Sequence, residues 1–181
     1  MATVEVVDTA NGTGSASTIS FTGIPADFKH LQAMAYVRSS YATTLDQFKI
    51  TINGNTTGYY CAGINAGMNS SSSPYAFAET TAGTHIYSAL GWMIAGASAT
   101  TGAHTPFEMW FANYAESTTK NCGILTCRAG DNNNNSGNTD NPVTVAGWFS
   151  DTAETLTSIE FTAANGNFSA DSWITLYGWR G

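Results

Sequence analysis

Apolar and polar residues alternate along most of the chain, which is the pattern of half-buried β-strands. The clearest segments are 31–37, 48–52 and 107–111, and each of them places its apolar residues on one side. Those residues are Leu31, Ala33, Ala35 and Val37, then Phe48, Ile50 and Ile52, and then Phe107, Met109 and Phe111. These three segments therefore predict strands that each cover a core with one face.

The same reading predicts further strands, with turns and loops between them. They fall within 3–7, 17–24, 121–129, 143–149, 155–163 and 172–179, and the pattern is weaker within 58–63 and 84–96. Asn53-Gly54 ends one strand with a turn in which both residues tolerate positive φ. The Ser-rich stretch 68–77 and the Asn-rich stretch 131–142 are loops by composition. We expect nine or ten strands and no helix, which is an all-β antiparallel sandwich or barrel.

The chain shows no repeat and no linker, so we expect one domain over residues 1–181. Residues 1–16 become rich in Gly, Ser and Thr after the first strand, and they are either an arm or part of the core. The N-terminus lacks the charged and apolar regions of a signal peptide. The stretch 87–99 is too short and too rich in Gly and Ser to cross a bilayer.

The last strand differs from the others because both of its faces carry large apolar residues. Ile174 and Leu176 point one way, and Trp173, Tyr177 and Trp179 point the other way. A strand at the surface of a lone sandwich usually has one polar face. We therefore predict that the first pair fills the core and that the three rings pack on a further layer or another chain.

Trp110 also lies opposite the apolar side of its strand, in a chain whose residues are 12% aromatic. An aromatic stripe opposite a core face has two functional interpretations. One is a platform on which sugar rings stack. The other is a protein interface, where Trp and Tyr are favoured anchors. The candidate interface residues are Trp110, Trp173, Tyr177 and Trp179.

Charge excludes some classes of partner. The chain has six Lys and Arg against thirteen Asp and Glu, which gives a net charge of −7. Scattered basic residues cannot form the patch that nucleic acid requires. The sequence also lacks a basic amphipathic stretch that would suggest a membrane surface. We therefore expect neither nucleic acid nor a membrane as partner.

Motifs for catalysis are missing from the sequence. There is no Gly-x-Ser-x-Gly and no glycine-rich phosphate loop. Nothing in the sequence places any two of the carboxylates together as a glycosidase requires, and Glu108 and Glu160 are predicted to point outward from strands. The carboxylates considered are Glu108, Glu116, Asp151, Glu154 and Glu160. The sequence therefore predicts a protein that is not an enzyme and uses no cofactor.

Metal sites are not indicated either. The three histidines, His30, His85 and His104, lack metal-ligand spacing. Asp131 begins a stretch that resembles a calcium loop, but its twelfth position is Pro142 where such a loop needs a bidentate Glu. We expect a flexible loop there and no metal.

Three cysteines allow at most one disulfide within the chain. Cys122 and Cys127 are five residues apart, which puts them on opposite faces of a strand and argues against a bridge between them. We expect Cys61, Cys122 and Cys127 to be buried free thiols, as in a protein made in a reducing cytoplasm.

Several segments resemble a jelly-roll-like β-sandwich domain of virion proteins from tailed bacteriophages. The stretch STISFTGIPADFKHLQAMAYVRSS is similar to that group's I-x-F-x-G-I-P-x-x-(F/Y)-x-x-L opening and the strand that follows it. FKITINGNTTGYY resembles its I-x-(I/F)-N-G strand, and FEMWFANYAESTTKNCG its E-x-x-(I/F)-x-N-Y segment. TLTSIEFTAANGNFSADSWITLYGW resembles its last two strands, with Asp171-Ser172 where the group has Gly-Ser.

The resemblance covers about Ser17 to Gly178, is weakest over 60–100, and brings no catalytic residues. It implies a single jelly-roll-like antiparallel β-sandwich and a structural protein of the virion, assembled in the bacterial cytoplasm. Members of the group decorate capsids or form tails and fibres. The expected partners are further copies in a homotrimer, the major capsid protein or other virion subunits. The alternative is a tail-fibre or receptor-binding module that binds a host surface glycan.

Overall fold

We describe the protein from a computed structural model, in which residues 3–66, 75–78, 83–86, 93–128 and 143–181 are described. All twelve elements there are β-strands, so the prediction of an all-β antiparallel sandwich is confirmed. The strands are β1 Thr3–Asn11, β2 Thr18–Thr22, β3 His30–Val37, β4 Leu45–Ile52, β5 Tyr59–Ala66, β6 Tyr75–Ala78, β7 Met93–Ala95, β8 Thr105–Ala112, β9 Lys120–Arg128, β10 Val143–Ala153, β11 Ser158–Ala163 and β12 Trp173–Arg180. In this part of the chain no helix is long and apolar enough to span a bilayer.

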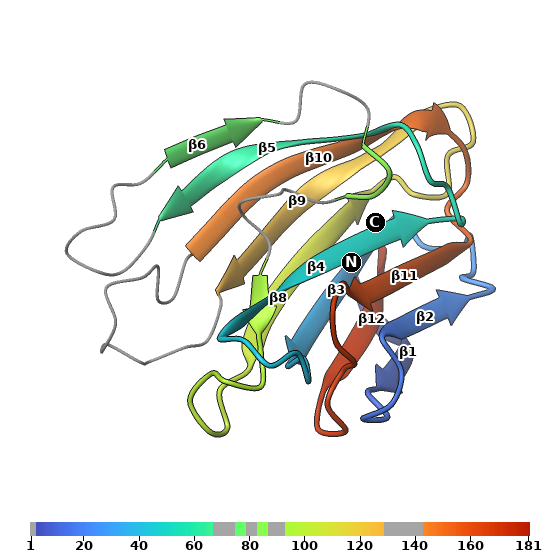
Figure 1. Cartoon of the computed structure of the whole chain (residues 1–181). Helices are drawn as coiled ribbons and strands as arrows, with labels where there is room; N and C mark the ends of the chain where they lie inside the picture. Colours follow the sequence, from blue (N-terminus) through green and yellow to red (C-terminus); the bar gives the residue numbers. More distant parts are fainter. Residues whose placement is uncertain (1–2, 67–74, 79–82, 87–92, 129–142) are drawn as a thin grey trace.

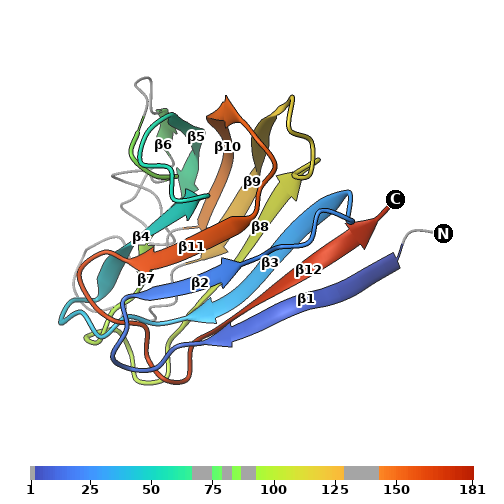
Figure 2. The same ribbon diagram turned by 90° about the vertical axis from the view of Figure 1, so that its right-hand side faces the viewer.

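The strands form two antiparallel sheets. The large sheet has the order β1-β12-β3-β8-β9-β10-β5-β6, and the small sheet has the order β2-β11-β4-β7. Figures 1 and 2 show the small sheet lying over the end of the large sheet that contains β1, β12, β3 and β8. Strands β10, β5 and β6 extend past the small sheet (Figure 1). The large sheet therefore has an inner face toward the core and an outer face that points away from it.

The core lies between the sheets and is built from the alternation read in the sequence. Every apolar residue predicted to face inward from 31–37, 48–52 and 107–111 is buried, and so are Ile174 and Leu176. Phe48 packs against Phe107 and Phe161, with ring centroids 4.9 and 6.0 Å away, and this joins the two sheets. Burial of a side chain of this size contributes about 1.5–3 kcal/mol.

Local turn chemistry also behaves as predicted. Asn53 and Gly54 both have positive φ, 51° and 69°, and the Asn53 side chain accepts hydrogen bonds from the backbone N–H groups of Thr157 and Ser158. The turn after β4 is therefore tied to the start of β11. Asn tolerates the left-handed region better than most residues, which explains its use at this position.

Three expectations about elements need correction. The Ser-rich stretch 68–77, predicted as a loop, contains the start of β6, whose short Tyr-Ala-Phe-Ala sequence gives little periodicity. Residues 3–11, considered as part of an arm, form β1 at the edge of the large sheet, where Val6 pairs with Tyr177 of β12. The described ranges alone contain twelve strands, instead of the nine or ten expected for the chain. The Asn-rich stretch 131–142 and its calcium prediction lie outside the described residues.

Candidate functional site

Large apolar side chains gather on the outer face of the large sheet. Among the described residues, ten large hydrophobic side chains are exposed, and strand pairing places nine of them on this face. The tenth is Tyr41, which lies in the loop after β3. The nine, which are 37–62% exposed, are Val4, Val6, Met34, Tyr36, Ile64, Ile124, Val145, Phe149 and Trp173. Soluble monomers rarely expose an apolar patch of this extent unless it binds something.

The nine residues fall into two patches at opposite ends of the face. The first patch consists of Val4, Val6, Met34, Tyr36 and Trp173, on β1, β12 and β3. The second patch consists of Ile64, Ile124, Val145 and Phe149, on β9, β10 and β5. The sheet order separates them, because β8 lies between β3 and β9.

A polar seam lies between the patches and satisfies its own hydrogen bonds. Glu108 Oε1 accepts hydrogen bonds from Gln32 Nε2 at 2.7 Å and from Trp110 Nε1 at 2.6 Å. Trp179 Nε1 donates to Gln32 Oε1 at 3.1 Å, and the two indoles pack with centroids 5.2 Å apart. Glu108 points outward as predicted, and neighbours within the chain hold its carboxylate. A carboxylate with two such donors is poorly available to a partner.

The four candidate interface residues thus have different surroundings. All four point from the outer face, as the alternation predicts. Trp110 and Trp179 are half-buried and packed on each other, and Tyr177 is half-buried beside Val6. Trp173 is exposed at one end of the face, where its ring lies 6.5 Å from that of Tyr36 at an angle of 28°. Sequence alternation did not identify the second patch. Both sides of the segment 143–149 carry apolar residues, so alternation alone does not indicate which side is exposed.

The outer face also contains two shallow hollows, of which the first adjoins the first patch and extends over β8. The first, of about 450 Å³, is lined by Met34, Tyr36, Trp173, Glu108 and Thr126. The second, of about 430 Å³, adjoins the second patch and is lined by Tyr60, Ala62, Cys122, Gly147 and Phe149. Gly147 leaves this second hollow open, because a Cβ added there would meet no atom closer than 4.0 Å.

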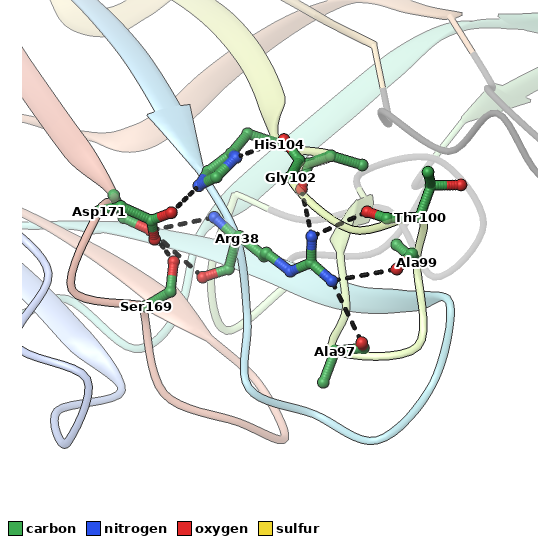
Figure 3. Close-up of polar contacts among 10 residues, drawn as sticks. Arg38, Ala97, Ala99, Thr100, Gly102, His104, Ser169 and Asp171 are labelled. Carbon is green, nitrogen blue, oxygen red and sulfur yellow. Dashed lines mark hydrogen bonds and ion pairs between the residues drawn. The ribbon is translucent and has the colours of Figure 1, made fainter.

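Arg38, the residue after β3, is tied to the loop that precedes β8 (Figure 3). The Arg38 guanidinium donates to four carbonyl oxygens of one loop, those of Ala97, Ala99, Thr100 and Ala103, at 3.0–3.1 Å. The loop that precedes β8 therefore surrounds the guanidinium group of Arg38, the residue that follows β3. Because Arg38 bonds to the carbonyl group of Ala103, it also positions His104, the next residue in the chain.

His104 connects this loop to the turn before β12. Its ring stacks on Tyr36 with centroids 4.3 Å apart, and its Nε2 lies 3.1 Å from Asp171 Oδ2 (Figure 3). A hydrogen bond from Ser169 and the contact with His104 lower the pKa of Asp171 below its ordinary value. The Tyr36 ring therefore packs against a buried imidazole, and this contact holds the ring in place at the first patch.

The structure does not assemble the other candidate residues into a site. Glu108 points outward from the large sheet, whereas Glu160 of β11 in the small sheet bonds to Thr51. Asp151 pairs with Lys120 at the border of the outer face. His30 accepts a hydrogen bond from the Asn113 backbone. Among the described residues, no group of three or more His, Cys, Asp or Glu could hold a metal ion.

The cysteines are all free, but they are not all buried. Cys61 and Cys127 point into the core, and burial raises the pKa of Cys127 to about 11. Cys122 is exposed on the outer face beside the second hollow, which corrects the prediction of three buried thiols. Cys122 and Cys127 do lie on opposite faces of β9, as their spacing predicts.

Comparison of the chain with protein-family models, with curated proteins and with solved structures finds no match.

Proposed function

We propose that this chain is a structural protein of a bacteriophage virion that binds other protein subunits through the outer face of its large sheet. A capsid-decorating role, as cement or head-fibre protein, is the form of the proposal that we favour. The observation that carries it is the concentration of nine exposed large hydrophobic side chains on one sheet face. The resemblance over Ser17 to Gly178 supplies the virion context.

The chemistry of the face supports a protein partner. Its projecting residues are largely aliphatic, with Val6, Ile64 and Ile124 all more than half exposed. Sites for small polar ligands need a few polar groups that are placed to meet the ligand. The polar groups near the middle of this face, Gln32 and Glu108, already bond to each other. An apolar surface of another subunit is the partner that such a face fits.

The proposed partners are the major capsid protein or other virion subunits, together with further copies of the chain in a homotrimer. The proposed location is the virion, after assembly in the cytoplasm of the bacterial host. Three free thiols suit synthesis in a reducing compartment. We propose a binding role and no catalytic one, since the carboxylates that the sequence offered are spread over both sheets.

Electron microscopy of intact particles tests this proposal most directly. We expect an antibody against the chain to label purified virions, on the capsid for the decorating role. We also expect added wild-type chain to rebind particles that lack it, whereas Ile124→Lys/Val145→Lys rebinds at least tenfold less. Tyr41→Lys, which changes an exposed aromatic residue away from the face, is the matched control. Particles that contain none of the chain, or equal rebinding by all three proteins, would overturn the proposal.

The second candidate is a tail-fibre or receptor-binding module that holds a host surface glycan. It is favoured by the Tyr36 and Trp173 rings, which lie at 28° to each other beside the first hollow. Labelling at the tail, together with a glycan-array signal that Trp173→Ala abolishes, would favour this candidate over capsid decoration.

A further inference from the structure

The two patches of the outer face differ in shape and are complementary in kind. The second patch has projecting aliphatic side chains, with Ile64 58% and Ile124 54% exposed. The first patch has two flat rings, Tyr36 and Trp173, beside a hollow of about 450 Å³. Projections on one patch and a hollow on the other are the features of a surface that packs against a copy of itself in an offset manner.

The second hollow offers the reverse fit. Gly147 and Ala62 are small residues and form the floor of this hollow. The stacked rings of Tyr60 and Phe149 border it. Val6 and Trp173 of the first patch project from the opposite end of the face. Each patch therefore has projecting apolar side chains and an adjoining recess, and the recess beside the first patch extends over β8 to Glu108 and Thr126.

Charge indicates which partner the face accepts. The chain has a net charge of −7, so copies that meet through a charged surface would repel each other. Glu108 is the described charged side chain in the middle of the face, and Gln32 and Trp110 already hold it. A strongly basic partner would find little to pair with here. A second outer face of the same chain is equally apolar and poor in charge.

The size of the face indicates that each copy uses both patches. Half of the large sheet is four strands wide, which is about 19 Å, and eight residues long, which is about 26 Å. One such half covers about 500 Å² in projection, less than the roughly 800 Å² per partner of a typical stable interface. Two halves together reach that size. A stable assembly therefore needs each copy to use both patches.

We propose that the outer face is an interface between copies of this chain, in which the first patch of one copy packs on the second patch of another. This inference shares its surface with the proposed function, and it concerns which patches meet. Pairing of unlike patches lets every copy use both of them, and the contacts close in a two-fold pair or in a ring.

Complementation between two variants tests the pairing. Val6→Lys/Met34→Lys disables the first patch, and Ile124→Lys/Val145→Lys disables the second patch. All four residues are exposed, so the fold is expected to persist, and circular dichroism checks it. Lys makes the net charge less negative, so that a loss of association cannot come from added repulsion. Tyr41→Lys is again the control. Native mass spectrometry and light scattering at about 50 µM read the masses without any virus particle present.

We expect a closed oligomer for wild type and for Tyr41→Lys, and monomers for each double variant alone. An equimolar mixture of the two double variants is expected to form a one-to-one heterodimer, because one intact first patch then meets one intact second patch. This heterodimer is expected to dissociate more readily than the wild-type oligomer, since it buries one patch of each copy instead of two. A monomeric wild type would overturn the inference. So would a double variant that still self-associates alone, which is the result that pairing of like patches predicts. A mixture in which the two double variants form no heterodimer would also overturn it.

Cys122 supplies an independent readout. It is an exposed thiol beside the second hollow, so assembly is expected to slow its alkylation at least tenfold relative to the monomeric variants. Equal alkylation rates in oligomer and monomer would contradict contact at the second patch. Because these measurements use the purified chain alone, their failure is distinct from a failure to find the chain in virions.

Discussion

At the scale of single residues, Arg38 has a structural role. Its guanidinium donates four hydrogen bonds to backbone carbonyl groups of the loop before β8, and these bonds join four residues of that loop to a single side chain. Arginine presents five N–H donors on a planar group, and here two of its nitrogens each reach two carbonyl oxygens. The three donors of lysine sit on one nitrogen and cannot span the same set. Arg38 therefore ties β3 to the approach of β8 and supports the first patch indirectly.

We predict that Arg38→Ala lowers the free energy of unfolding by about 2–4 kcal/mol, because several charge-assisted hydrogen bonds are lost. Arg38→Lys is expected to lose most of the same amount. Urea denaturation measures both, with Lys29→Ala, a change at an exposed cation, as control. An unchanged midpoint for Arg38→Ala would show that the loop holds its shape without the guanidinium.

The thiols provide a second prediction at this scale. At pH 8, one thiol per chain, Cys122, is expected to react rapidly with a disulfide reagent in the monomeric protein. Cys61 and Cys127 should react slowly, because both are buried and the pKa of Cys127 is raised to about 11. Cys122→Ser should remove the fast phase, and denatured wild type should titrate three thiols. A single thiol after denaturation would instead reveal a disulfide.

Asp171 leads to a prediction about acid. Its pKa is lowered in the fold by Ser169 and His104, so its contribution to stability is present at neutral pH and is lost as the pH falls through the lowered pKa. We expect Asp171→Asn to be less stable than wild type at pH 6 and to approach it near pH 2.5. The difference is small, because the carboxylate is 67% exposed. A constant difference across this range, measured by chemical denaturation, would contradict the linkage.

Among the strands, β9 and β10 each contain a glycine, and the two glycines have different roles. A Cβ on Gly123 would strike the backbone oxygen of Trp110, so glycine there permits a close approach between β9 and β8. Gly147 on β10 faces open space on the outer face and creates the second hollow. One glycine is required by packing, and the other shapes the surface.

We predict that Gly123→Ala destabilises the protein by about 3 kcal/mol or more, because the backbone must shift to admit the methyl group. Gly147→Ala is its matched control, and we expect a change within about 1 kcal/mol, in either direction. Thermal and urea unfolding of the two variants, prepared in parallel, measure the contrast. Equal destabilisation would mean that Gly147 is also enclosed.

At the scale of the whole molecule, the large sheet presents apolar side chains to both of its sides. The inner side is covered in part by the small sheet, and the outer side carries nine exposed large hydrophobic residues. A two-layer sandwich has one interior, so a second apolar face requires a third layer. We propose that other subunits form that layer.

We predict that Trp173→Ala combined with Tyr177→Ala yields a folded protein that no longer assembles. Interface anchors of this kind contribute about 2–4 kcal/mol each. Light scattering at micromolar concentration measures the mass, and circular dichroism confirms the β-sheet content. Trp110→Ala would be a poor substitute for this test, because Trp110 also bonds to Glu108 within the chain. A double variant with the wild-type mass would place the two rings outside the interface.

The fold class and the residues of the core could be predicted from the sequence alone. Alternation and turn chemistry are local properties, so the inward residues of β3, β4, β8 and β12 could be read from the order of residues alone. β6 was missed because four residues in a Ser-rich stretch give no usable period. The place of β1 was also missed, because an exposed edge strand shows no contrast between its two faces.

The arrangement of side chains on the outer face depends on the order and register of the strands. Gln32, Glu108 and Trp179 are far apart in sequence, and their hydrogen bonds exist because register brings β3, β8 and β12 side by side. The two patches likewise depend on strand order, which places β8 between them. Periodicity reports which residues share a side of one strand, but it contains no information about neighbouring strands. Contacts across strands are set by the packing of the whole chain, and only the folded molecule reveals them.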